Sequence, residues 1–217
     1  MDPGADVALQ SGNENIGENL GEVMMETIAG METIANDIRT WPWFSTPHGY
    51  NFNGLLIAHP QGNICIDPVE ASTADFEEIV RARPRHVLLT NRNHVRAANR
   101  VREQTGARVA IHPADGPHAR SQGALIDDEL SVGQHIGPLT VVAVPGKSPG
   151  EVALHWPERK ILIVGDAVIG NPPGRCGLLR EQVMDDPKRL RESVMRHLRV
   201  TSAISCCEMI HASHPVK

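Results

Sequence analysis

The chain has 217 residues, of which 41% are hydrophobic, and this composition suits one globular domain with a sizeable core. The formal net charge of -5 is uneven: residues 1–40 hold eight acidic groups and one arginine, a net of -7, which leaves about +2 elsewhere (-5 minus -7). No basic stripe with interleaved aromatic residues is present, so we expect no nucleic-acid partner. No apolar run reaches about 18 residues, so we expect no membrane span.

The first twenty residues are polar and acidic, and we therefore predict no signal peptide. The cysteines, Cys65, Cys176, Cys206 and Cys207, show neither CxxC spacing nor the pattern of a small disulfide scaffold. Adjacent residues on a strand point to opposite faces, so Cys206 and Cys207 do not form an obvious site. We interpret the thiols as buried or incidental, in a reduced, cytoplasmic protein.

Residues 1–40 are predicted to be an acidic appendage to a domain that covers residues 41–217. Residues 1–13 are rich in Gly, Asp, Asn and Ser and should be disordered. From Ile16 to Ile38 the apolar positions follow helical spacing with acidic residues between them. This segment is either a docking or dimerisation helix or a loosely held acidic tail.

The first half of the domain reads as strands and helices in alternation. Five of the seven aromatic residues lie between Trp41 and Phe52, which is typical of a core. A hairpin with strands at 52–59 and 63–67 follows, and then a helix over 70–83 that Ser72 or Thr73 can cap. The apolar run 86–90 predicts a buried strand, and the next helical stretch closes at Gly106.

The second half is richer in strands. Residues 108–113 are predicted as a strand and 113–123 as a loop, and turn residues divide 124–144 into further strands. VALHWPERKILIVG predicts a hairpin with its turn at 157–160. The last predicted helix runs over 186–198, with an Asp cap and Pro187 at its first position.

Three segments carry the polar residues that point to a site: HVLLTNRNHVR at 86–96, VPGKSPGE at 144–151 and VGDAV at 164–168. Their order and spacing resemble the metallo-β-lactamase fold family of hydrolases, which has THxHxDH, PGHSPGH and GDxLF at these places. The resemblance implies a four-layer αββα sandwich of the α/β (α+β) class. It also implies a site for one or two metal ions, and a supporting position behind that site for Asp67.

Most metal-binding positions of the family hold other residues here. Thr90 matches, but the His positions of the first motif fall on Asn91, Asn93 and Arg96, and the Asp position falls on Val95. The His of the second motif falls on Lys147, while Asp166 matches the bridging carboxylate. Valine cannot coordinate a metal, and Arg and Lys are cations. If any metal binds, its ligands are expected to be Asp166 and His94.

The remaining histidines add little to a metal site. Seven of them lie at scattered turns and strand ends, where solvated or hydrogen-bonded His is the usual finding. They are His48, His59, His112, His118, His135, His155 and His197. His211 and His214 resemble faintly the final histidine segment of the family.

Two functional interpretations follow. In one, Arg96 and Lys147 converge on Asp166 and neutralise it, so that the protein is metal-independent or non-catalytic and needs no cofactor. The remodelled cationic cleft then either serves as a salt-bridge network alone or takes an anionic small molecule through Asn91, Asn93, His94, Arg96, Lys147 and Asp166. In the other, zinc or another divalent metal supports hydrolysis of an ester, a thioester or another anionic small molecule.

Overall fold

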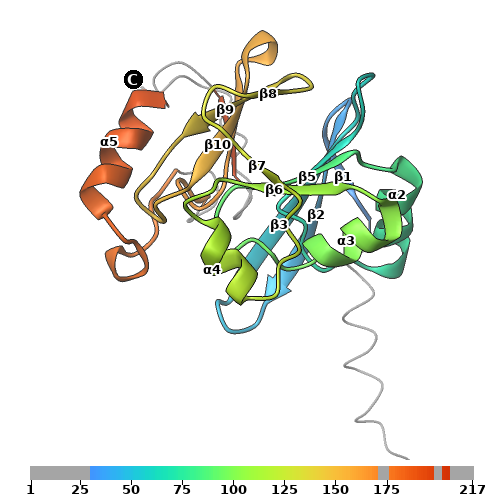
Figure 1. Cartoon of the computed structure of the whole chain (residues 1–217), viewed down its shortest axis with the longest axis horizontal. Coiled ribbons are helices and arrows are strands. Elements are labelled where there is room, and N and C mark those ends of the chain that lie inside the picture. Colours follow the sequence, from blue (N-terminus) through green and yellow to red (C-terminus); the bar gives the residue numbers. More distant parts are fainter. Residues whose placement is uncertain (1–29, 171–175, 198–201, 206–217) are drawn as a thin grey trace, which may run out of the picture.

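The computed structural model describes residues 30–170 and 176–197, and the backbone of residues 202–205. Two β-sheets stack face to face, with helices on both outer sides (Figure 1). The α5 helix lies beside the smaller sheet, and α2 and α3 lie beyond the larger one. Among the described residues, no helix is long and apolar enough to cross a membrane.

The larger sheet has seven strands in sequential order, β1 to β7. They are Glu32–Ala35 (β1), Ile38–Ser45 (β2), Tyr50–Ile57 (β3), Ile64–Ile66 (β4), His86–Leu89 (β5), Arg108–Ile111 (β6) and Asp128–Glu129 (β7). Pairing is antiparallel from β1 to β4 and parallel from β4 to β7. The carboxyl ends of β4 and β5 therefore meet at one edge, where the polar residues of the first motif follow β5.

The smaller sheet has five strands in the order β12-β11-β10-β9-β8. They are His135–Ile136 (β8), Leu139–Ala143 (β9), Val152–Trp156 (β10), Ile161–Val164 (β11) and Ser202–Ser205 (β12). The β10 and β11 strands form the predicted hairpin, and a 3₁₀ turn, Pro157–Arg159, joins them. The Lys147 motif leads into β10, and the Asp166 motif follows β11.

The helices complete the layers. They are Thr73–Ala82 (α2), Ala98–Thr105 (α3), Gly116–Ser121 (α4) and Pro187–His197 (α5), and a 3₁₀ turn at Glu181–Val183 precedes α5. Ser72 caps α2 as predicted, because its hydroxyl accepts a hydrogen bond of 3.1 Å from the Asp75 N–H.

Alternating residues on each strand face opposite sides of the sheet and so belong to different hydrophobic cores. Leu88 of β5 and Leu154 of β10 lie in the core between the sheets. Val87 and Leu89 face the other way, into a core shared with α2, α3 and α4. Leu190 of α5 packs on the outer face of the smaller sheet. This alternation produces the αββα sandwich, so the predicted fold class is confirmed.

The structure corrects two predicted elements. The helix predicted over 16–38 is wrong at its end, where β1 and the start of β2 occupy residues 32–38; residues 1–29 lie outside the described part. The sheet thus begins before the boundary that we placed at residue 41, and Ile38 is fully buried in the core. The loop predicted over 113–123 contains α4, whose buried Ala119 packs against the larger sheet.

Gly54 illustrates how tightly this core is closed. A Cβ atom at this position would lie 2.3 Å from Cζ2 of Trp41, whose ring is fully buried and whose Nε1 donates to the Val69 carbonyl at 3.2 Å. We expect Gly54→Ala to lower the free energy of unfolding by about 1–3 kcal/mol through overpacking. Urea denaturation measures the loss.

Gly116→Ala is the matched control, because the nearest neighbour of its added Cβ would be the flexible end of Arg120, at 3.0 Å, and Ile111 would lie at an ordinary contact distance of 4.0 Å. Equal effects of the two substitutions would contradict the steric explanation.

Candidate functional site

The site lies where four strand ends meet. Asp67 follows β4, Thr90 follows β5, Glu151 precedes β10 and Asp166 follows β11. The two sheets are joined here directly, because the Val152 N–H donates to the Thr90 carbonyl at 2.9 Å. Gly165 permits the close approach of the third motif, since a Cβ there would lie 2.2 Å from Thr90 Oγ1.

A chain of buried ionic contacts runs through the centre of the site. Asp67 accepts hydrogen bonds from the Thr90 N–H at 2.8 Å and the Thr90 hydroxyl at 2.5 Å. His94 lies between two carboxylates: its Nδ1 is 2.9 Å from Asp67 Oδ2 and its Nε2 is 3.2 Å from Asp166 Oδ1. The other oxygen of Asp166 is 3.4 Å from Lys147 Nζ. Both oxygens of Asp166 therefore face a cationic side chain.

Protonation of His94 is favoured by these neighbours. Burial lowers the pKa of His94, but Asp67 and Asp166 outweigh burial and raise it from 6.5 to about 9, against the opposing charge of Arg96. Burial raises the pKa of Asp166, yet His94, Lys147 and Arg96 together hold it below its ordinary value. His94 is thus an imidazolium at neutral pH and can donate from both ring nitrogens.

Asp67 has an unusual backbone that fits its supporting position. Its φ angle is 46°, in the left-handed region that few residues other than glycine adopt, and its side chain is fully buried. Burial raises the pKa of this carboxyl, but His94 and Thr90 bring it below its ordinary value. Asp67 and Asp166 contact His94 through different ring nitrogens, Nδ1 and Nε2.

The predicted residues of the first motif have separate places. Asn91 is fully buried and shapes the turn, because its Oδ1 accepts from the Asn93 N–H at 2.9 Å, while Asn93 itself is exposed. Val95 packs against the helix-side core. Of the expected pair of cations, Lys147 contacts Asp166 but Arg96 does not.

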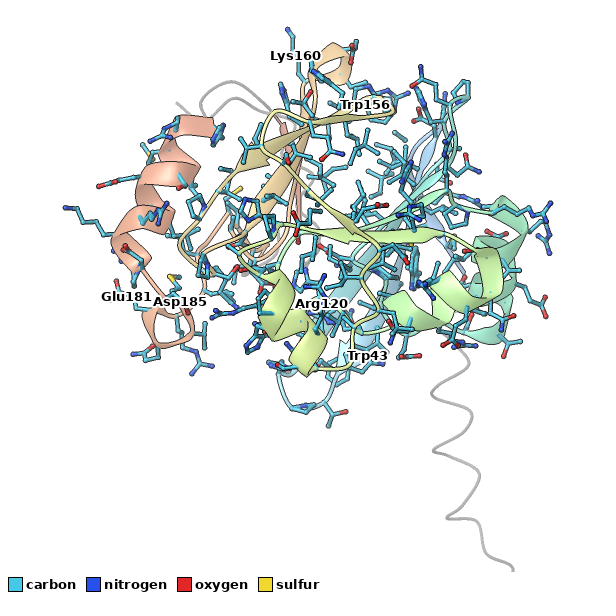
Figure 2. The ribbon with its side chains drawn as sticks, viewed as in Figure 1. Trp43, Arg120, Trp156, Lys160, Glu181 and Asp185 are labelled. Atoms are coloured by element: carbon cyan, nitrogen blue, oxygen red, sulfur yellow. The ribbon has the colours of Figure 1, made fainter. Side chains whose placement is uncertain are left out.

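Arg96 lies on an aromatic cluster instead. Its guanidinium carbon is 4.1 Å from the ring centroid of Phe52, and Phe52 contacts the rings of Trp43, His48 and Tyr50. The Arg96 Nη1 atom is buried and has no hydrogen-bond partner among the described residues. Trp43 lies at the opposite end of the sandwich from Trp156 and Lys160 (Figure 2).

Asp115 is a site residue that the sequence interpretation missed. It is fully buried and accepts hydrogen bonds from the Arg92 N–H at 2.9 Å, the Ser148 hydroxyl at 2.5 Å and the Gly150 N–H at 2.8 Å. Asp115 thereby ties the first motif to the second. Its place in an apparent loop, 113–123, gave no signal of this contact.

Arg92 was expected to line a cationic cleft together with Arg96 and Lys147, whereas Glu151 was outside the predicted set. Arg92 forms an ion pair of 2.7 Å with Asp185, which lies on the segment before α5 (Figure 2). Glu151 is 1% exposed, and neither carboxyl oxygen has a hydrogen-bond partner among the described residues. A Glu placed directly before the apolar run of β10 is the one sequence signal that it is buried.

Among the described residues, the side chains around Asp166 do not form a metal-binding set. In the part of the chain that the structure describes, no group of three or more His, Cys, Asp or Glu residues is arranged to hold one. The two candidate ligands, His94 and Asp166, bind each other, and Lys147 occupies the remaining oxygen of Asp166. His211, His214, Cys206 and Cys207 lie outside the described residues; Cys65 is buried and Cys176 is exposed.

Comparison with known proteins identifies the family of this chain. The family model described as the metallo-beta-lactamase superfamily matches residues 31–210. The chain belongs to the metallo-beta-lactamase superfamily. A hydroxyacylglutathione hydrolase of Cereibacter sphaeroides is 31% identical over 136 residues, which are 59% of this chain and 47% of that protein. The chain therefore spans about half the length of the curated relatives that it matches.

Solved structures share the fold of this chain. The crystal structure of TTHA1623 in a di-iron-bound form is 26% identical, with a TM-score of 0.59 over 82% of this chain and 91% of that one. A metallo-beta-lactamase from Pontibacter korlensis is 17% identical, with a TM-score of 0.66 over 81% and 89%. The frame of the superfamily is thus present in this chain.

Proposed function

We propose that this protein is a metal-independent member of the metallo-beta-lactamase superfamily, in which a chain of charged side chains takes the place of the metal. The observation that carries the proposal is the placement of Asp166 between His94 at 3.2 Å and Lys147 at 3.4 Å. A carboxylate that two cations already neutralise has little to gain from a divalent ion. The same contacts engage both oxygens of Asp166 and both ring nitrogens of His94, so neither side chain is free to activate a water molecule.

We further propose that an anionic small molecule is the partner of the cleft. Support comes from the first motif, where Arg96 lies over the ring of Phe52 without an ion pair among the described residues, Arg92 is paired with Asp185, and Asn93 is exposed. Lys147 is committed to Asp166, so Arg96 is the better candidate for a direct ion pair with an anion. Its guanidinium offers a planar fork that suits a carboxylate or a phosphate.

The test is a metal count together with a turnover assay. Protein purified without chelator should contain much less than one zinc, iron or manganese per chain, and added metal should leave its melting temperature unchanged. It should also fail to hydrolyse an acylglutathione thioester, the substrate class named for the curated relatives. One of those hydrolases, prepared in parallel, is the positive control. Calorimetric titration of the wild type and of Arg96→Gln with inorganic phosphate tests whether the site binds an anion through Arg96.

The alternative is a metal-dependent hydrolase of an ester, a thioester or another anionic small molecule, and the similarity to hydroxyacylglutathione hydrolases favours it. One stoichiometric metal, with turnover that a chelator abolishes and the metal restores, would establish this alternative and overturn the proposal.

A further inference from the structure

Glu151 is the group at the site that the ionic chain leaves unexplained. Its side chain is buried, both carboxyl oxygens lack a partner among the described residues, and it lies in the electrostatic field of Asp166 and Lys147. Burial first, and then the charge of Asp166, raise the pKa of Glu151 well above its ordinary value, while Lys147 and His94 oppose the rise. A buried carboxyl group without a partner is costly, so it indicates a place meant for a cation or a proton.

Lys147 contacts the carboxylate of Asp166, and its charge also acts on the carboxyl group of Glu151. Its side chain is only 7% exposed, and its contact with Asp166, at 3.4 Å, is longer than the usual charge-assisted hydrogen bond of about 2.7–2.9 Å. An ammonium group carries three donors, and Asp166 is the one carboxylate in ion-pair contact with it among the described residues. The Lys147 ammonium group therefore acts as a cation that is held at Asp166 by its own side chain. Its distance from Asp166 is longer than that of a well-formed ion pair.

We infer that Asp166 and Glu151 form a binding site for a small cation, and that the side-chain ammonium of Lys147 is its resident occupant. When the tether is removed, the site should accept a free small cation, either an alkylammonium or a divalent metal. The inference rests on the proposed function, since it requires that the wild-type site binds no free metal. It goes further, because it assigns Glu151 to the site and names what the site can hold.

The test is chemical rescue of Lys147→Ala. This substitution removes a fragment with the size and charge of propylammonium. The melting temperature of Lys147→Ala should fall and should then rise by several degrees with propylammonium chloride, and again, separately, with manganese chloride. Wild type should not respond to either ion. 1-Propanol has the same size without the charge and should not rescue the variant.

Two further variants make the result specific. Lys188→Ala removes an exposed lysine of α5 and should behave as wild type throughout. Lys147→Ala combined with Glu151→Gln should lose most of the manganese response, because Asp166 alone offers one carboxylate.

The outcomes separate the two proposals. A metal response in the wild type would overturn the proposed function. An unresponsive wild type together with an unresponsive Lys147→Ala would overturn only this inference. If Lys147→Ala does not fold, the double variant Lys147→Met/Asp166→Asn provides the test. It should be more stable than Lys147→Ala, because neither member of the ion pair is left charged. A double variant that is no more stable would count against the site.

Discussion

Replacing Asp166 with alanine should lower the free energy of unfolding by about 3–5 kcal/mol, the usual cost of breaking a buried ion pair by removing one partner. The substitution leaves the Lys147 ammonium, 7% exposed, without its described ion pair and takes one of two carboxylates from His94. It also removes the contact that joins the first and third motifs. The effect should exceed that of any surface charge.

Asp128→Ala is the matched control in urea denaturation of both variants. Asp128 pairs with Arg108, but the two side chains are 40% and 57% exposed, so its loss should cost at most about 1 kcal/mol. Similar midpoints for Asp166→Ala and Asp128→Ala would show that the buried chain of charges contributes little to stability.

The second large effect concerns pH. The folded-state pKa of His94 is about 9, against an ordinary value of 6.5, so the folded protein binds the proton more tightly than the unfolded chain does. This contribution is complete below pH 6.5 and disappears as pH rises through 9. A shift of this size corresponds to about 3 kcal/mol of stability. Urea denaturation at a series of pH values from 6 to 9 should follow the loss.

Two variants test whether His94 causes this pH dependence of the free energy of unfolding. His94→Gln should be less stable at pH 6, and its stability should fall much less between pH 6.5 and 9. Glu151→Gln measures the part of the fall that Glu151 contributes, because Glu151, with a raised pKa, also favours folding at lower pH. The buried Cys65 thiol, whose pKa burial raises, contributes only above its ordinary value of 9.0. An unchanged slope in His94→Gln would contradict the protonated state of His94.

Local patterns were sufficient to predict most of the fold. A continuous apolar run located β5, and the turn at 157–160 located the hairpin of β10 and β11. The Ser72 and Pro187 signals located the starts of α2 and α5. The N-terminal strand was missed because the apolar spacing of residues 16–38 is helical, whereas pairing with β2 determines the structure of β1. Tertiary contact overrides local propensity in such cases.

The contacts of the site could be predicted only where a residue's position in a sequence motif determines its partner. The contact between Lys147 and Asp166 followed from the family frame and is present. The partners of His94 were not foreseen, because this residue occupies a spacer position and its contact with Asp67 depends on the left-handed turn after β4. Arg96 was expected at Asp166, but an aromatic face competes for a guanidinium, and Phe52 lies closer in the fold than its sequence distance suggests.

The direct bond from Val152 to the Thr90 carbonyl has a consequence for how the molecule opens. Together with the His94 and Asp166 contact, it couples the strand ends of both sheets at one edge of the sandwich. Amide hydrogens at that edge should therefore exchange with solvent only when both halves open together, as one cooperative unit. The ionic contacts of His94 and Asp166 thus hold the two sheets together at this edge. Substitutions here that change ligand preference would therefore also change the stability of the fold.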